Sequence, residues 1–327
     1  MPVLTTSKPE AVSIPAPFAG RVRAFLEACE LDRNLSPLTI RQYDYYLGTL
    51  LAWLGKHQPA VQDIADLTTD VVRQYKLSLS RRVTPATGKP LTRATQTYFL
   101  VALRSLLRWC AQQGIDALSA DRVELGKANS RSLKFLDADQ MARLLAAPDV
   151  ATTRGLRDRA LLETLFSTGL RVSELAALDR QQVNLKTREF GVIGKGRKLR
   201  VVFLSDAAAE WLQRYLQARH DKYRPLFMRT RGELDTSPGG PGMRMSPRSI
   251  ERMVKKYVRL AGLGISATPH TLRHSFATDL LTNGADLRAV QELLGHANLS
   301  TTQIYTHVTN PQLRAVHRKF HSGNRES

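Results

Sequence analysis

Apolar residues recur at helical spacing through the first third of the chain. Behind Ser36 and Pro37, a pair typical of a helix start, leucines and tyrosines follow three or four positions apart up to Gly55. The periodicity returns after a basic, turn-rich loop at 81–92 and closes at Gly114. The pattern predicts an all-helical region with helices at 18–30, 37–55, 69–80 and 93–113.

The composition changes on either side of this helical region. Residues 1–17 are rich in Pro, Ser and Ala and predict a flexible tail. Residues 127–134 are polar, have no strong period and predict a linker. We therefore expect a helical domain at 18–126 and a second domain at 135–327.

The second domain mixes helical and strand-like patterns. The runs QVNLK, REFGVI and KLRVVFL, between residues 182 and 204, predict a small antiparallel sheet, and PLFM at 225–228 predicts a further strand. The Gly/Pro-rich segment 230–247 predicts a mobile loop. Helical patterns lie at 137–146, 155–167, 206–219 and 247–262. The predicted fold class is mainly α with a small antiparallel β-sheet (α+β).

The stretch from Thr268 onward carries the first candidate chemistry. Thr268 is a suitable N-cap and Pro269 suits the first helical position. His270 and Arg273 then lie three apart in the first turn and share a face. A cation, an imidazole and a helix N-terminus together favour binding of a phosphate.

Two further candidates follow. A helix at 286–294 is predicted to stop at Gly295, which places His296 at a helix–loop boundary. The sequence Ser-Thr-Thr-Gln at 300–303 fits a capping box, so a short helix is expected to carry Tyr305. Taken alone, a tyrosine such as Tyr305 is more often a packed aromatic residue with a satisfied hydroxyl.

Two cations lie upstream. Arg171 begins a helix within TGLRVSEL, and Lys195 lies on the turn GKGRK, which is too short for a Walker phosphate loop. Each has an ordinary alternative: a surface arginine paired with Glu174, and a solvated turn lysine. Only the combination of all these residues points to one site.

The net charge of the chain indicates what kind of molecule it binds. The chain carries a formal net charge of +19, of which +14 lies in residues 131–327, so a nucleic acid is expected. Arginines and lysines in helical patterns are candidates for DNA contact, with a solvated helix face as the alternative for each; they are Arg93, Arg104, Arg248, Arg252 and Lys255.

Other sequence features concern location. No apolar run approaches the roughly 20 residues that span a bilayer, so no membrane contact is expected. The N-terminus lacks the charge and apolar pattern of a signal peptide. Cys29 and Cys110 have no metal-ligand or C-x-x-C spacing and fit a reducing compartment. We expect a bacterial cytoplasmic protein.

The motifs together resemble the tyrosine recombinases, also called the phage integrase family, and look closest to the Xer type. The matching pieces are TGLRVSEL, GKGRKLR, TPHTLRHSFAT and LLGHANLSTTQIYTHV behind a helical domain, and the resemblance covers residues 18–320. It implies a SAM-like core-binding domain that contacts DNA at 18–126 and a catalytic domain at 135–327.

The resemblance also implies a mechanism. Tyr305 would attack the scissile phosphodiester and form a 3′-phosphotyrosyl bond with a free 5′-hydroxyl. His270 would take the tyrosine proton, and Lys195 would protonate the leaving 5′-oxygen. Because the covalent bond conserves the energy of the cut phosphodiester, no ATP, metal or other cofactor is expected.

The remaining roles concern the phosphate oxygens and the assembly. Arg171 and Arg273 would hold the non-bridging oxygens, and His296 would donate one more hydrogen bond. By resemblance, a homo- or hetero-tetramer acts on two DNA duplexes at a specific site. A last helix at 311–320, with apolar residues at helical spacing, would dock on a neighbouring protomer.

Two other functions stay open at this point. A type IB topoisomerase uses a similar catalytic set and relaxes arbitrary DNA as a monomer. A non-catalytic DNA-binding regulator on the same scaffold would share the charge, although a complete set of catalytic side chains would then be unexpected.

Overall fold

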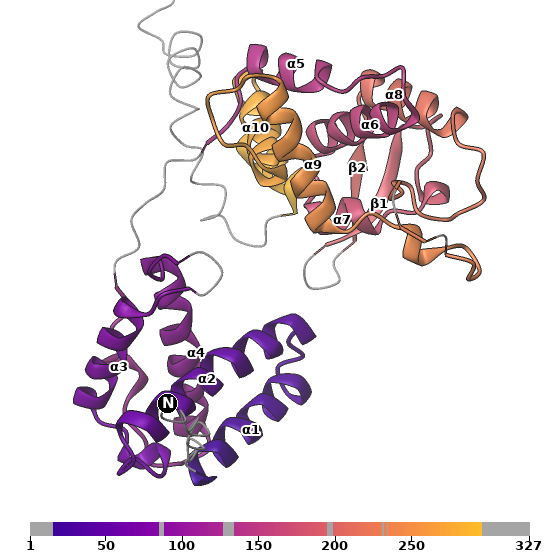
Figure 1. Ribbon diagram of the computed structural model, residues 1–327. Helices are drawn as coiled ribbons and strands as arrows, with labels where there is room; N and C mark the ends of the chain where they lie inside the picture. Colours follow the sequence, from indigo (N-terminus) through magenta and orange to yellow (C-terminus); the bar gives the residue numbers. More distant parts are fainter. Residues whose placement is uncertain are drawn as a thin grey trace, which may run out of the picture. The chain divides into compact units, whose positions relative to one another are not determined.

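The computed structural model describes residues 16–84, 88–126, 134–194, 199–230, 232–233 and 235–295 (Figure 1). The chain divides into two compact units, Met1–Arg131 and Ser132–Ser327. Helices dominate the described part of both units, and the second unit also contains a two-stranded sheet. The predicted fold class, mainly α with a small antiparallel sheet, is confirmed, while the individual domain limits stay predictions.

The N-terminal unit is built around its last long helix. α4 packs against the other three long helices of the unit, and its inner face buries Phe99, Leu103 and Trp109. Side-chain oxygens of Ser36, Thr68 and Thr92 accept hydrogen bonds from the first turns of α2, α3 and α4, which is why these helices begin where the sequence predicts. The long helices are α1 (Ala16–Leu31), α2 (Pro37–His57), α3 (Thr69–Arg81) and α4 (Arg93–Gln112), with 3₁₀ turns at Ile64–Asp66 and Ala120–Arg122.

The C-terminal unit is organised around α6, which packs against α8 and α10. α6 ends at Gly169, whose φ of 58° is left-handed, and a Cβ there would lie 2.4 Å from the ring of Phe276. Only glycine therefore permits the close approach of α6 and α10. The helices are α5 (Ala138–Ala146), α6 (Thr153–Thr168), α7 (Val172–Ala177), α8 (Asp206–Gln217), α9 (Pro247–Leu260), α10 (Pro269–Thr282) and α11 (Leu287–Leu294), with 3₁₀ turns at Arg180–Gln182 and Pro241–Met243.

The sheet has fewer strands than the sequence predicts. β1 (Glu189–Ile193) and β2 (Leu199–Phe203) pair antiparallel, with Phe190 opposite Val202. The prediction that QVNLK forms a strand is wrong, because the Asn184 side chain accepts hydrogen bonds from the backbone of residues 186 and 187 and closes a turn. The prediction of a strand at PLFM is also wrong, since residues 225 and 228 form only isolated bridges.

The Gly/Pro-rich segment 230–247 folds back on the C-terminal unit. Met243 and Met245 are buried, and their backbones pair with Arg229 and Phe227. Asp235 accepts hydrogen bonds from two further backbone groups of the segment. The described part of this loop is therefore pinned to the core, contrary to the expected mobile segment.

Candidate active site

The first turn of α10 begins as predicted and places a buried arginine. Thr268 caps the helix and Pro269 opens it. Arg273 is only 3% exposed, and its guanidinium donates to the carbonyl of Gly169 and, at 2.6 Å, to that of Leu294. These two carbonyls end α6 and α11, so one arginine ties three helices together.

Arg171 lies at the start of α7, close to the same helix ends. Its Nη1 donates to Glu174 Oε1 at 2.8 Å, and its Nη2 lies 3.4 Å from the carbonyl of Gly295. Glu174 also accepts from the backbone N–H of Arg171 at 2.9 Å, so this carboxylate both caps α7 and orients the guanidinium. The predicted Arg171–Glu174 pair is real, and it lies beside the predicted phosphate-binding helix.

The sequence analysis missed a third arginine, Arg200 on β2. Arg200 donates to both carboxylate oxygens of Glu174, at 3.0 and 2.7 Å, and to the carbonyl of Leu293 at 3.2 Å. Its side chain is 9% exposed. The available signal was a single arginine at a half-buried position of an otherwise apolar strand, where a buried cation requires a partner.

The charges of this cluster leave an excess of positive charge. Burial alone would raise the pKa of Glu174, but hydrogen bonds from Arg200 and Arg171 lower it to about 2. One carboxylate thus pairs with two guanidiniums, those of Arg171 and Arg200. A phosphate group supplies negative charge, and two of its oxygens can accept from the planar fork of one guanidinium.

Two histidines accompany Arg273 on α10. The rings of His270 and His274 lie 4.3 Å apart edge to face. Burial lowers the pKa of His270, and the charges of Arg273 and Arg171 lower it further. His270 is therefore neutral at pH 7 and can accept a proton. Burial, His270 and Arg273 lower the pKa of the buried His274 to about 4.

The structure thus brings together three of the six predicted catalytic residues, namely Arg171, His270 and Arg273, since both arginines act electrostatically on the histidine. The other three, Lys195, His296 and Tyr305, lie outside the described residues. The predicted helix at 311–320 lies outside them as well. Among the described residues, no group of His, Cys, Asp and Glu has a metal-binding arrangement.

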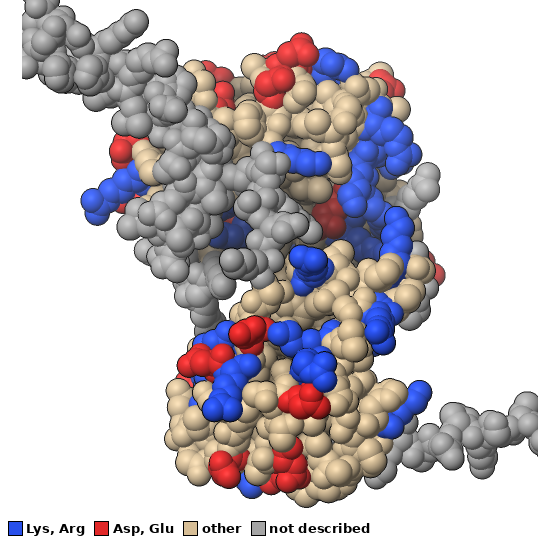
Figure 2. Space-filling view, turned by 90° about the vertical axis from the view of Figure 1, so that its left-hand side faces the viewer, with Lys and Arg blue, Asp and Glu red and all other residues tan. Residues whose placement is uncertain are grey.

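The candidate DNA-contact residues occupy different settings. Arg248, Arg252 and Lys255 are exposed on α9, whose other face buries Ile250 and Val254. Figure 2 shows lysine and arginine side chains gathered along one side of the C-terminal unit.

The two candidates on α4 differ from each other. Arg93 is exposed at the start of the helix, and its side chain lines a small hollow with Lys76. Arg104 is 19% exposed and pairs with Asp121 at 2.9 Å. Arg93 is therefore the more accessible cation.

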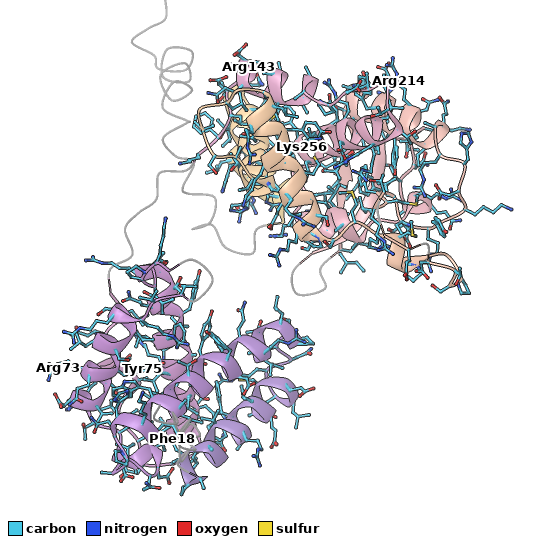
Figure 3. All side chains as sticks on the ribbon, viewed as in Figure 1. Phe18, Arg73, Tyr75, Arg143, Arg214 and Lys256 are labelled. Carbon is cyan, nitrogen blue, oxygen red and sulfur yellow. The ribbon has the colours of Figure 1, made fainter. Side chains whose placement is uncertain are left out.

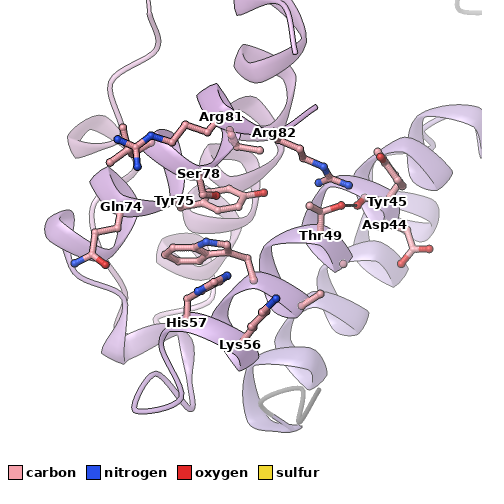
Figure 4. Close-up of a pocket in the computed structure, with 15 residues that line it drawn as sticks. Asp44, Tyr45, Thr49, Lys56, His57, Gln74, Tyr75, Ser78, Arg81 and Arg82 are labelled. Atoms are coloured by element: carbon pink, nitrogen blue, oxygen red, sulfur yellow. Dashed lines mark hydrogen bonds between the residues drawn. The ribbon is translucent and has the colours of Figure 1, made fainter. Parts of the chain in front are cut away.

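The N-terminal unit also has a basic cavity that the sequence analysis missed. It has a volume of about 1260 Å³ and opens between α2 and α3, with Tyr75 at its floor (Figure 4). Four basic side chains line it: Lys56, His57, Arg81 and Arg82. No single helix carries them all, so the periodicity of one helix could not reveal the group.

Comparison with known families identifies the class of protein. Residues 134–311 match the phage integrase family, and residues 22–114 match the N-terminal SAM-like domain of phage integrases. The chain therefore belongs to the phage integrase family, the tyrosine recombinases, which cleave and rejoin DNA strands. The predicted family and enzyme class are confirmed.

The relatives are Xer-type recombinases. Tyrosine recombinase XerC of Pelobacter propionicus is 38% identical, over 93% of this chain and 96% of its own. Tyrosine recombinase XerD of Pseudomonas aeruginosa is 39% identical, over 91% and 95%. The fold is similar to that of XerH site-specific recombinase bound to palindromic difH substrate, with a TM-score of 0.67 at 22% identity over 91% of this chain and 84% of that one.

No helix among the described residues is long and apolar enough to cross a membrane.

Proposed function

We propose that this protein is a site-specific DNA recombinase that cuts and rejoins duplex DNA through a 3′-phosphotyrosyl intermediate at Tyr305. The observation that carries the proposal is the convergence of Arg171, Arg273 and neutral His270 around the ends of α6 and α11. Two fixed guanidiniums and a proton acceptor meet the requirements of phosphoryl transfer.

Cleavage exchanges one bond to phosphorus for another. The Tyr305 oxygen bonds to phosphorus while its proton passes to His270, which is neutral at pH 7 because burial and the nearby arginines lower its pKa. The bond from phosphorus to the 5′-oxygen breaks, and Lys195 protonates that oxygen. Attack by the 5′-hydroxyl of a second strand then reverses these steps and releases Tyr305.

The position of the undescribed candidates along the chain supports these roles. His296 is bonded to Gly295, whose carbonyl lies 3.4 Å from Arg171. Lys195 belongs to the segment of the sequence between β1 and β2, five residues before Arg200. Both chain segments therefore leave from residues of the arginine cluster.

We propose double-stranded DNA as the partner, with α9 and the N-terminal helices gripping its backbone. XerH site-specific recombinase, whose fold is similar to that of this chain, is solved bound to palindromic difH substrate. Four protomers would hold two duplexes, and the segment 311–320 would dock on a neighbouring protomer.

Deleting the residues after Asn310 is expected to weaken cooperative binding and synapsis more than single-site binding, as measured by gel shifts.

Replacement of the nucleophile tests the reaction. The Tyr305→Phe variant should bind DNA with normal affinity and form no covalent adduct on a denaturing gel, whereas Tyr257→Phe serves as a matched control on α9 and should still form one. An adduct with Tyr305→Phe would move the nucleophile elsewhere. Relaxation of plasmids that lack any recombination site would instead support a topoisomerase.

A further inference from the structure

A second cluster of cations lies on the C-terminal unit, away from Arg171 and Arg273. It lines a cavity of about 500 Å³ between the start of α6, one side of α9 and the segment 228–230. The cavity is lined by Arg154, Arg157, Arg229, Thr230, Met245, Ser249, Arg252, Met253 and Lys256. Five of these side chains are cations, and none is a carboxylate.

The inner wall of this cavity is rigidly built. Arg157 is 4% exposed, donates to Asp158 Oδ1 at 2.5 Å and to the carbonyl of Met228 at 2.7 Å. The other oxygen of Asp158 accepts from the Tyr257 hydroxyl at 2.9 Å and lies 4.0 Å from Arg154. This single buried carboxylate is thus already engaged by Arg157 and Tyr257, and it offsets at most one of the five positive charges.

Arg229 on the opposite wall has unused hydrogen-bonding capacity. Its Nη2 donates to the carbonyl of Glu233 at 2.7 Å. Its Nε is buried and has no hydrogen-bond partner within the part of the chain that the structure describes. A buried donor without a partner is unfavourable, and an acceptor that reached it would remove that penalty.

Two other arginines on the surface of this unit each pair with a carboxylate. Arg214 pairs with Glu210 and Arg188 pairs with Asp206. Figure 3 shows Arg214 and Lys256 on different parts of the unit. Among the described residues, neither Lys256 nor Arg252 pairs with a carboxylate. Arg252 lies 3.3 Å from the hydroxyl of Ser249, and Lys256 lies 4.7 Å from the ring centroid of Tyr257.

We propose that this cavity binds a phosphate group. Unit charges of one sign around one hollow repel each other unless an anion enters, and phosphate accepts several charge-assisted hydrogen bonds at once. The phosphate has two sources: the backbone of DNA or a free phosphate compound. The DNA source rests on the proposed function, and the exposed arginines of α9 next to the cavity favour it.

The site is separate from the candidate active site. Arg154 and Arg157 lie in the first turns of α6, whereas Gly169 and Arg171 follow its last turn. A helix of 16 residues is about 24 Å long, so one phosphate cannot reach both ends.

Calorimetric titration of the full chain with pyrophosphate at constant ionic strength tests the proposal. The Arg229→Gln/Lys256→Gln variant should lose at least about tenfold in affinity, which corresponds to one or two lost charged hydrogen bonds. The Arg188→Gln/Arg214→Gln variant, which removes the same charge from the same unit, should stay within about twofold of the parent. Equal affinities in the two variants and the parent would overturn the proposal.

A second variant distinguishes loss of phosphate binding from loss of folding. Lys256→Glu changes one exposed side chain and places a carboxylate at the cavity. Pyrophosphate binding at the cavity should therefore be lost, leaving only the binding at the arginine cluster of the candidate active site, while the melting temperature is kept. Undiminished binding by Lys256→Glu would also overturn the proposal. The titration contains no DNA, so its result does not depend on Tyr305 or on recombination.

Titration of the same variants with DNA distinguishes the two sources of the phosphate group. In the logarithmic plot of DNA affinity against salt, each phosphate contact contributes about 0.9 to the slope. A slope reduced by about 1 in Arg229→Gln/Lys256→Gln, and not in the control variant, identifies the DNA backbone. An unchanged slope with lost pyrophosphate binding identifies a free phosphate compound.

Discussion

The arginines of the candidate active site and those of α9 differ in how firmly they are held. Arg273 is buried and donates to the last carbonyls of α6 and α11, and Glu174 fixes both Arg171 and Arg200. Arg248 and Arg252 extend from α9 into solvent. Fixed guanidiniums can stabilise charge that develops at one atom, whereas exposed ones contribute charge to binding. We therefore propose that the same residue type serves catalysis in one region and affinity in the other.

The largest effect is expected from substitution of Arg273, a buried arginine of the candidate active site. Arg273→Ala should slow DNA cleavage by about 10²–10³-fold, as expected for the loss of one positioned donor. Arg273→Lys should be nearly as slow, because one ammonium cannot reach both carbonyls and a phosphate. Single-turnover cleavage and gel-shift affinity measure the two effects. Arg248→Ala is the matched control and should lower affinity while keeping the cleavage rate of bound DNA. A fast Arg273→Lys enzyme would contradict a geometric role.

Removal of the Glu174 carboxylate, which pairs with Arg171 and Arg200, should lower the stability of the fold. Glu174→Gln is expected to lower the free energy of unfolding by about 3 kcal/mol, because two partly buried guanidiniums lose their counter-ion. Glu210→Gln, which breaks the exposed pair with Arg214, should cost less than about 1 kcal/mol. Urea unfolding of both variants makes the comparison, and equal losses would mean that the Glu174 pairs are ordinary surface ion pairs.

The pH dependence of stability offers a smaller effect in the same region. The pKa of His274 falls from 6.5 in the unfolded chain to about 4 when folded. Between these values the unfolded state binds more protons, so stability should fall as the pH drops from about 6.5 to 4, by about 2–3 kcal/mol. Above pH 6.5 this contribution is constant. In the His274→Gln variant, the loss of stability between pH 6.5 and pH 4 should be smaller by about 2–3 kcal/mol. Identical pH profiles of unfolding for the variant and the parent would contradict the low pKa of His274.

The smallest effects concern two arginines of α4, of which Arg93 is exposed and Arg104 is paired with Asp121. Arg93→Ala should reduce DNA affinity a few-fold and lower the salt slope by about 1, as expected for one lost phosphate contact. Arg104→Ala should change the slope less, because Arg104 is already paired with Asp121. Filter binding at several salt concentrations measures both slopes. A larger change for Arg104→Ala would show that this ion pair opens on DNA.

Much of this organisation could be predicted from local signals. Ser36, Thr268 and Gly295 mark helix ends in the sequence, and each has the predicted role in the structure. Such signals depend on a few neighbouring residues, so they survive in any tertiary context.

Other features depend on contacts between distant residues and could not be predicted. Asn184 closes a turn where β-rich composition favours a strand. The partnership of Arg200 with Glu174 joins residues 26 positions apart. The phosphate cavity requires the start of α6, one side of α9 and the segment around Arg229 to meet. All three features depend on tertiary packing, and the periodicity of residues along the chain contains no information about that packing.

Mapping of the covalent adduct tests the central claim most directly. A nicked duplex carrying the cleavage site would trap the protein on DNA, and mass spectrometry of the digested adduct would locate the modified residue. The account predicts a phosphodiester between Tyr305 and the 3′ end of the cut strand. A nucleotide attached to any other residue, or a 5′-phosphate linkage to Tyr305, would contradict it.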